Sequence, residues 1–323
     1  MPINPSNEYF LGIDGGGTKT EVVISDSSGF VFGRGISSGS NFHNLTFDLI
    51  YRNIQDAVKQ ANHSVNVNLL NFSSVCLGIA GIDTPSERQK FADSLKKIPP
   101  DSRIFWSQKF CLCQDGLIGL MSGTSQKYGV CLIASTGANC FGVNSLGKSA
   151  TAGDWGYLLG DQGSGFAIGL KIIKTVIKEF DGRRPVSPMT DLVLSSLKLS
   201  EVRDLIAWAY DGPVRVKEIA SLSRLLDAPE FIGTIDHFEI IKDTVQELME
   251  AYLSVICRLD LKNQHYPLVM VGGLFKSAHI KTQLVSKISE KTPMAVILSP
   301  DRTPAEGAIR VAINCRDYQK LLI

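Results

Sequence analysis

Runs of apolar residues separated by short polar turns open the chain and predict a small sheet. Residues 9–36 carry three such runs, and the turn at 26–29 (Asp-Ser-Ser-Gly) supplies a left-handed glycine between the last two. Apolar side chains recur at helical spacing over 46–61, and 74–79 and 103–106 are short apolar runs typical of buried strands. Alternating strands and helices predict an α/β domain.

The same pattern restarts at residue 128. An apolar run covers 128–134, a loop of small residues covers 135–139, and a second apolar run at 140–143 leads to a turn at 144–147. The order strand, small-residue loop, strand, turn, strand therefore occurs twice. We expect two similar α/β halves with a cleft between them that binds one nucleotide.

The remainder of the second half predicts mainly helices. A serine at 164 is a suitable helix cap, and the following residues have a strong apolar face. Helices are expected over 164–180, 236–261 and 304–314, the last crossing back to the first half, and strands over 268–271 and 295–299.

A glycine-rich turn with one carboxylate interrupts the first apolar runs. Residues 11–20 read Leu-Gly-Ile-Asp-Gly-Gly-Gly-Thr-Lys-Thr, so a hairpin tip without large side chains follows Asp14. Such a tip lets backbone N–H groups approach an anion, and a carboxylate beside it suits Mg²⁺. The spacing is that of neither common nucleotide-binding loop. The turn is either a phosphate loop with Asp14 as the metal ligand or a purely structural hairpin.

Composition narrows the class of protein. The 323 residues carry a net charge of +1 and are 44% hydrophobic, which fits a globular chain of about two domains and offers no electrostatic footprint for nucleic acid or membrane. We see no signal peptide and no membrane span, and expect a cytoplasmic protein. Ligand-type cysteine spacing is absent. Five of the seven cysteines lie in apolar runs and are predicted to be buried thiols: Cys76, Cys111, Cys131, Cys140 and Cys257.

Six motifs in order give the chain a resemblance to a known family. They are Asp14-Gly15-Gly16-Gly17-Thr18, Ser40-Asn41-Phe42-His43-Asn44, Gln114-Asp115-Gly116, Ser135-Thr136-Gly137-Ala138-Asn139-Cys140, Gly153-Asp154-Trp155-Gly156 with Gly160-Asp161-Gln162-Gly163-Ser164, and Val271-Gly272-Gly273-Leu274-Phe275-Lys276-Ser277. Over nearly its whole length the chain thus resembles the sugar kinases of the actin/hexokinase/Hsp70 superfamily. Within them it is most similar to the N-acetylglucosamine and glucosamine kinases of the BadF/BadG/BcrA/BcrD type.

The resemblance implies a fold and a reaction. The fold would be α/β, with two ribonuclease H-like α/β domains (the actin-like ATPase fold) and an inter-domain nucleotide and sugar cleft. The domains would be residues 1–117 plus 305–323, and residues 118–304. The reaction would be Mg²⁺-dependent phosphorylation by ATP of the 6-hydroxyl of a hexose or amino sugar, N-acetylglucosamine or glucosamine before others, in a homodimer.

The resemblance also implies a site. Asp115 would be the general base, since phosphoryl transfer needs one group that orients the attacking hydroxyl, although by its position alone it could be a helix N-cap. Mg²⁺ would lie at Asp14. ATP would contact Asp14, Gly15, Gly16, Gly17, Thr18, Lys19, Ser135, Thr136, Gly137, Gly272, Gly273 and Lys276. The sugar would contact Ser40, Asn41, Asp115, Asn139, Asp154, Trp155 and Asp161.

Some alternatives stay open. The 2-hydroxyacyl-CoA dehydratase activator ATPases resemble the same motifs but need cysteines that bridge an iron–sulfur cluster between subunits, and a non-catalytic sugar-binding regulator would not need Asp115. Trp155 either stacks on a sugar face or packs, and His43 is expected to be a loop histidine with a hydrogen-bond partner. The chain departs from the family motifs at Ser135, Ala138, Asp154 and Gln162, and the last two alter the charge near the sugar.

Overall fold

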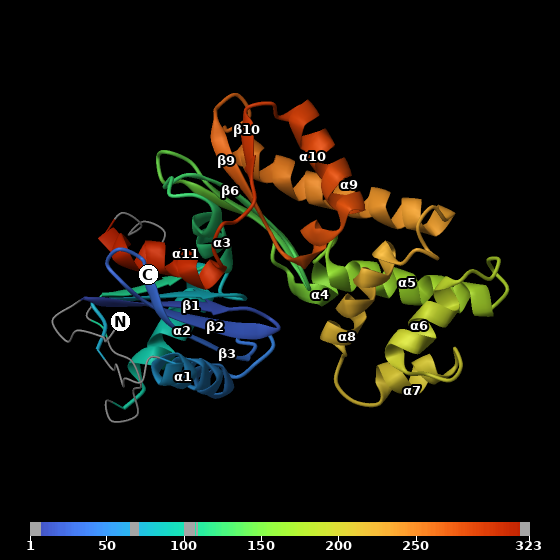
Figure 1. The fold of residues 1–323 in the computed structure, drawn as a ribbon, viewed down its shortest axis with the longest axis horizontal. Helices are drawn as coiled ribbons and strands as arrows, with labels where there is room; N and C mark the ends of the chain where they lie inside the picture. The colour runs from blue at the N-terminus through green and yellow to red at the C-terminus, as the bar shows by residue number, and fades with distance from the viewer. Residues whose placement is uncertain (1–7, 65–70, 100–106, 108, 317–323) are drawn as a thin grey trace.

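The computed structural model describes residues 8–64, 71–99, 107 and 109–316, whose strands form two five-stranded sheets (Figure 1). The first sheet has the order β3-β2-β1-β4-β5. Its first three strands are antiparallel neighbours, and β4 and β5 extend it in parallel. Its strands are β1 (Tyr9–Gly15), β2 (Lys19–Asp26), β3 (Val31–Ser38), β4 (Ser74–Ile79) and β5 (Phe110–Cys113). The strand expected over 103–106 lies outside the described residues.

The second sheet repeats the first. Its order, β8-β7-β6-β9-β10, matches β3-β2-β1-β4-β5 strand for strand, with the same mixture of antiparallel and parallel pairs. Its strands are β6 (Gly129–Ala134), β7 (Ala138–Val143), β8 (Ser149–Gly153), β9 (Tyr266–Val271) and β10 (Ala295–Leu298). The predicted duplication is confirmed. The small-residue loop is shorter than expected, because Ala138 and Asn139 already pair within β7.

Helices cover both sheets. α1 packs on β2 and β3, whereas α3 and α11 lie between the two halves (Figure 1). The helices are α1 (Phe47–Ser64), α2 (Pro85–Lys96), α3 (Asp115–Gly123), α4 (Gly156–Leu159), α5 (Gly165–Phe180), α6 (Met189–Leu197), α7 (Asp204–Tyr210), α8 (Val216–Ser221), α9 (Ile235–Arg258), α10 (Ala278–Lys291) and α11 (Pro304–Ile313), with 3₁₀ turns η2 (Leu222–Asp227) and η3 (Gly273–Lys276). Ser164 caps α5 as expected, its hydroxyl accepting the Ala167 N–H.

An apolar joint connects the halves through α3 and α11. One buried cluster takes side chains from the first sheet, from both helices and from the second sheet, among them Phe10, Ile118, Cys131 and Ile309. Gly12 of β1 allows close approach, because a Cβ there would collide with the Ala305 carbonyl oxygen on α11. The chain passes between the halves twice, at α3 and between β10 and α11. The halves are therefore coupled by packed helices rather than by a loose linker.

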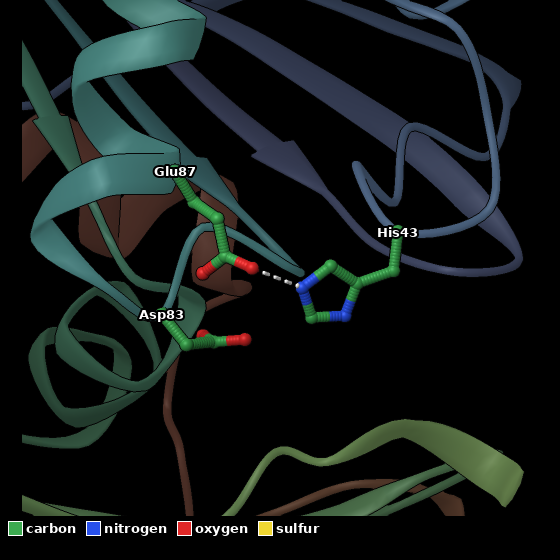
Figure 2. A group of neighbouring side chains, drawn as sticks. All are labelled: His43, Asp83 and Glu87. Carbon is green, nitrogen blue, oxygen red and sulfur yellow. Dashed lines mark hydrogen bonds and ion pairs between the residues drawn. The ribbon is translucent and has the colours of Figure 1, made fainter.

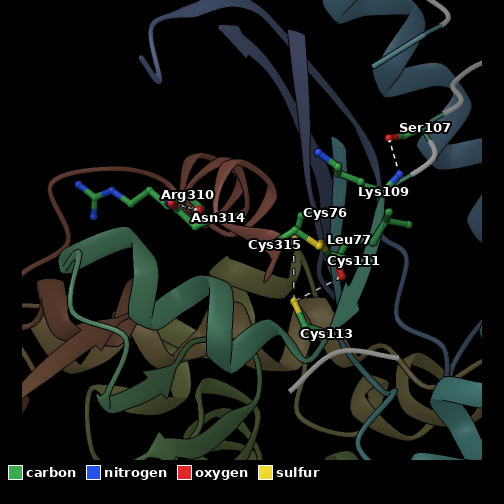
Figure 3. The surroundings of a disulfide bond; sticks show 9 residues. All are labelled: Cys76, Leu77, Ser107, Lys109, Cys111, Cys113, Arg310, Asn314 and Cys315. Atoms are coloured by element: carbon green, nitrogen blue, oxygen red, sulfur yellow. Dashed lines mark hydrogen bonds between the residues drawn. A yellow bond between two sulfur atoms is a disulfide. The ribbon is translucent and has the colours of Figure 1, made fainter. Parts of the chain in front are cut away.

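The cysteines correct one prediction. Cys111 of β5, expected to be a thiol, forms a disulfide with Cys315, which follows α11 (Figure 3). Cys257, expected to be buried, is exposed on α9, whereas Cys76, Cys131 and Cys140 are buried thiols as predicted. The partner at 315 lies 204 residues away, so local apolar patterning could not reveal it.

Among the described residues, none of the helices combines the length and the apolarity that a membrane crossing requires.

Candidate active site

The two small-residue loops face each other across the gap between the halves. The tip of the β1–β2 hairpin and the β6–β7 loop meet at two hydroxyls, with 3.3 Å between Thr18 Oγ1 and Thr136 Oγ1. Beside them, Gly17 has open space where a Cβ would project. The Nζ of Lys217, on α8, donates to the Thr18 carbonyl oxygen at 3.1 Å. Sequence reasoning missed Lys217, since a solvated helix lysine has no distinguishing pattern.

The second loop is held from below by its own backbone and by Asp161. The Gly165 N–H donates to the Ser135 carbonyl oxygen at 2.8 Å, and the Ser135 N–H to that of Gly137 at 2.8 Å. Asp161 Oδ1 accepts the Ala138 N–H at 3.1 Å, and a Cβ added at Gly137 would come within 2.9 Å of the same oxygen. Asp161, expected among the sugar contacts, is thus placed against the loop of Ser135, Thr136 and Gly137.

Two carboxyl groups, those of Asp14 and Asp115, interact electrostatically with each other. Asp14 is near the end of β1, and Asp115 is the first residue of α3, directly after its N-cap Gln114. Burial raises the pKa of Asp14 to about 7, with the Asp115 charge adding to the effect and Lys19 opposing it. Burial also raises the pKa of Asp115 to about 7, followed by the charge of Asp154, while hydrogen bonds from the Gly116 N–H and the Asn139 side chain lower it. Asp115 does not act as the N-cap.

A second carboxyl pair, one member of which sequence reasoning missed, adjoins Asp115. Asp83, in the loop after β4, shares a hydrogen bond with Asp154, in the loop after β8. The Gln114 amide donates to Asp83 Oδ1 at 3.3 Å, and the Asn139 amide donates to Asp154 Oδ1 at 2.5 Å. Burial raises the pKa of Asp83 to about 7 and that of Asp154 to about 8. Asp83 ends a strand–glycine–acid run, Ile79-Ala80-Gly81-Ile82-Asp83, a signal comparable to the one that marked Asp14.

The loop predicted to lie on the sugar side approaches the same place. Ser40 is fully buried, its hydroxyl 2.5 Å from that of Thr20 and its N–H bonded to the Gly16 carbonyl oxygen. The Asn41 side chain accepts the His43 N–H at 2.9 Å. Ser40 therefore joins the sugar-side loop to the first glycine loop, and Asn41 orders the turn that carries His43.

His43, Asp83 and Glu87 form the one group of potential metal ligands found among the described residues (Figure 2). Their ligand atoms lie within 4.8 Å of one another. His43 Nε2 is 2.8 Å from Glu87 Oε1, the partner expected for a loop histidine. Glu87 also completes the capping box of α2 with Thr84. Glu87 is thus already engaged, and so is Asp83 through Gln114 and Asp154.

The remaining predicted residues differ in how far their surroundings constrain them. Gly272, after β9, has φ of 125°, and a Cβ there would collide with the Ala134 carbonyl oxygen, so glycine is required. Gly273 borders open space and Lys276 is exposed. Lys19 pairs with Glu21 at 2.6 Å. Trp155 is 70% exposed and lies outside the buried core.

Duplicated sheets, facing hydroxyl-bearing loops and a carboxyl cluster between them define an actin-like ATPase fold. The chain belongs to the BadF/BadG/BcrA/BcrD ATPase family, whose model matches residues 11–312. It is 34% identical to an N-acetyl-D-glucosamine kinase of Dictyostelium discoideum, covering 96% of this chain and 99% of that protein. It is 30% identical to an N-acetylmuramic acid/N-acetylglucosamine kinase of Clostridium acetobutylicum, covering 94% and 98%. A candidate N-acetylglucosamine kinase from Chromobacterium violaceum has the same fold, with a TM-score of 0.76 at 21% identity over 94% of this chain and 99% of that one.

Proposed function

We propose that this chain is an ATP-dependent kinase that transfers the γ-phosphoryl group to the 6-hydroxyl of an amino sugar, with N-acetylglucosamine as the leading acceptor. The observation that carries the proposal is the meeting of Thr18 and Thr136 between the halves, in a structure where Asp115 interacts with Asp14 of the first glycine loop and with Asn139 of the second half. Two facing loops suit a polyphosphate, and a carboxyl beside them suits a hydroxyl acceptor. The names of the two curated relatives support an amino sugar as the acceptor.

Asp115 is the proposed general base. Its pKa of about 7 lies near the working pH, where a base combines a useful deprotonated fraction with a strong enough drive to take a proton. The Asn139 side chain hydrogen-bonds to it and holds the carboxylate for the attacking hydroxyl. Asp115 accepts that proton as the oxygen attacks the γ-phosphorus, and Asn139 and Asp154 are proposed to bind hydroxyls of the sugar.

The residues present fit Mg-ATP. Asp14 and Asp115 are buried carboxyls that disfavour each other's charge and, among the described residues, Lys19 is the one cation that acts strongly on Asp14. A divalent cation would relieve that repulsion, and Asp14 is the proposed residue that holds it, directly or through water. When bound, Mg²⁺ supplies charge neutralisation on the transferring phosphoryl group. Thr18, Thr136 and the N–H groups of residues 15–17 are proposed to contact the phosphates, and Gly272, Gly273 and Lys276 the adenosine.

The domain bounds, the oligomeric state and the cellular compartment remain proposals. We propose domains of residues 1–117 plus 305–323 and 118–304, a boundary that falls within α3. A homodimer stays a prediction, to be measured by light scattering on the purified chain. Use of ATP favours the cytoplasm as the site of action, and a thiol titration of protein from that compartment would show whether Cys111 and Cys315 are joined there.

The dehydratase-activator alternative is less well supported. A cluster bridging two subunits needs surface thiols, whereas Cys76, Cys113, Cys131 and Cys140 are buried. The exposed Cys257 has no second ligand residue grouped with it in the described part of the chain. A non-catalytic regulator is disfavoured by the two carboxyls at 14 and 115, which a binding protein would not need.

ADP release measured over hexoses and amino sugars tests the proposal, with mass spectrometry of the phosphorylated product. The 6-deoxy form of the preferred sugar should bind and not react. Asp115→Asn should lower kcat by about 10²–10⁴-fold, or about 3–5.5 kcal/mol in barrier, because the amide cannot accept the proton. The sugar Kd, measured by calorimetry, should stay within a few fold.

Asp191→Asn is the matched control, since it removes one exposed carboxylate on the outlying α6 and should leave kcat unchanged. A kcat for Asp115→Asn within a few fold of the parent would disprove the base assignment. Sugar-independent ATP hydrolysis alone would disprove the kinase.

A further inference from the structure

Asp83 and Asp154 form a carboxyl pair across the gap between the halves. Asp83 belongs to the loop between β4 and α2, and Asp154 to the loop between β8 and α4. They are hydrogen-bonded to each other, and amides flank them on both sides: Gln114 donates to Asp83 at 3.3 Å and Asn139 donates to Asp154 at 2.5 Å. Gln114 directly precedes Asp115 in the chain, and Asn139 donates a hydrogen bond to Asp115. The pair is therefore adjacent to the place where the acceptor is proposed to bind.

The charges that face the pair are mostly acidic. Asp115 on α3 and Glu87 on α2 act on Asp83, and Asp161 before α5 acts on Asp154. His43, on the sugar-side loop, is the base nearby, and its ring bonds to Glu87. Within the described residues, neither lysine nor arginine is among the strongest electrostatic neighbours of Asp83 or Asp154. Among the described residues, the charged groups that act most strongly on the pair are thus acidic.

We propose that the Asp83–Asp154 pair selects the acceptor by charge, admitting neutral and positively charged amino sugars and rejecting an acceptor that bears a carboxylate. The inference rests on the proposed kinase function and deepens it. Asp83 and Asp154 act here as specificity-determining residues. A like charge brought against a half-buried carboxylate that faces other acidic groups is repelled more strongly than in water, and such repulsion excludes one class of ligand.

The geometry of Asp154 supplies variants that should fold. Its φ of 66° lies in the left-handed region, which asparagine tolerates and glycine favours. Asp154→Asn keeps the shape of the side chain and removes its charge. Asp154→Gly removes the side chain and relaxes the backbone. Asp83→Asn removes the other half of the pair.

The experiment compares kcat/KM for three acceptors in one protein at saturating Mg-ATP. N-acetylglucosamine is the neutral acceptor, N-acetylmuramic acid the anionic one, and the methyl ester of that acid has nearly the bulk of the acid without its charge. In the parent, the acid should be a far poorer acceptor than its ester. In Asp83→Asn, Asp154→Asn and Asp154→Gly the ratio of acid to ester should rise about tenfold or more, as expected for removing one nearby like charge.

The ratio of the kcat/KM values for two acceptors, measured on the same sample, does not depend on how much of the enzyme is folded. Asp191→Asn, an equal change in net charge on α6, should leave the ratio unchanged. The parent's ratio should also fall as the pH rises from 6 to 9, because the pair becomes more ionised while the acceptor's carboxylate stays charged throughout, and this fall should be smaller in Asp154→Asn.

Equal use of the acid and its ester by the parent at pH 8, or an unchanged ratio in all three variants, overturns the inference while leaving the kinase proposal intact. Absence of phosphorylation of every sugar, the neutral ones included, overturns the kinase proposal and the inference with it. A poor acid and an equally poor ester indicate exclusion by size, which also overturns the role given to charge.

Discussion

At the scale of single residues, the site is a set of carboxyl groups whose ionised form is disfavoured by their surroundings in the fold. Asp14, Asp83, Asp115 and Asp154 all have a pKa raised to about 7 or 8, with burial as the leading cause. Such shifts concentrate where a protein prepares for a cation or for proton transfer. The same groups should make the stability of the ligand-free protein depend on pH.

The sign of that dependence follows from the raised pKa of Asp154. The folded protein keeps a proton on Asp154 until the pH approaches about 8, whereas the unfolded chain releases it near 3.8. The stability that the protonated form contributes is therefore complete below about pH 4 and lost as the pH rises through 8. We expect the melting temperature of Asp154→Asn, relative to the parent, to be higher at pH 8 than at pH 5.

Calorimetry at the two pH values measures this difference. Asp26→Asn is the control, because hydrogen bonds with Ser28 lower the pKa of that exposed carboxyl, so it is ionised at both pH values and its effect should not change between them. A melting-temperature difference for Asp154→Asn that is constant, or that falls towards pH 8, would contradict the expectation.

Substitutions of Asp14 and Asp115 should affect different steps, because the two residues lie in different parts of the site. Asp14 lies at the glycine hairpin, whereas Asp115 lies beside Asn139 and the carboxyl pair. Asp14→Ala should raise the KM for Mg-ATP, or lower kcat, much more than it weakens sugar binding measured by calorimetry. Near-normal Mg-ATP kinetics would show that residues 14–18 do not bind the phosphates.

How far the sequence predicts the site depends on how local each signal is. Asp14 and the glycine loop are contiguous, and Ser135, Thr136 and Gly137 lie in the corresponding turn of the second half, so spacing alone marked both. Gln114 and Lys217 act through contacts with residues distant in the chain. Their roles arise from tertiary placement, which one sequence without relatives does not encode in any readable pattern.

At the scale of elements, the predicted helices and strands were those with strong patterns and clear ends. α5 has its serine cap, α9 a long apolar face and α11 a proline after a capping threonine. α2 escaped prediction because Phe91 is its one fully buried side chain, so its apolar stripe is weak. The short helices α6, α7 and α8 bury few side chains each and escaped for the same reason.

The cap of α11 should be measurable, because α11 lies in the joint between the halves. The Thr303 hydroxyl accepts the Glu306 N–H and the Glu306 side chain accepts the Thr303 N–H, which together form a capping box. Thr303→Ala should lower the free energy of unfolding by about 1 kcal/mol (range ~0.5–2), as loss of an N-cap does. Thr303→Ser keeps the hydroxyl and should stay within a few tenths. Chemical denaturation of the three proteins checks this, and equal losses for Ala and Ser would assign the effect to the methyl group instead.

At the scale of the whole molecule, duplication explains why the site lies where it does. Equivalent hairpins, β1–β2 and β6–β7, bring their tips together because the two sheets face each other across α3 and α11 (Figure 1). Polar contacts join the halves at the gap, among them Thr18 with Thr136, Lys217 with Thr18, Gln114 with Thr151, Asn139 with Asp115 and Asp83 with Asp154. Behind them, the apolar cluster around α3 and α11 is continuous. A continuous apolar joint on one side and polar contacts on the other are the arrangement expected of a hinge between the two halves.

Sugar binding should therefore close the two halves. A ligand that bonds to groups of both halves, such as Asp83 and Asn139, favours the closed state by its differential contacts, and closure keeps water from the phosphoanhydride. The radius of gyration measured by small-angle scattering should fall when the preferred sugar is added and stay unchanged with its mirror-image form. Asp115→Asn should show the same fall, since it keeps sugar binding but cannot turn over, which separates closure from catalysis. If calorimetry confirms binding and the radius does not change, the halves do not hinge, and water must be excluded by the local ordering of loops such as the exposed segment around Trp155.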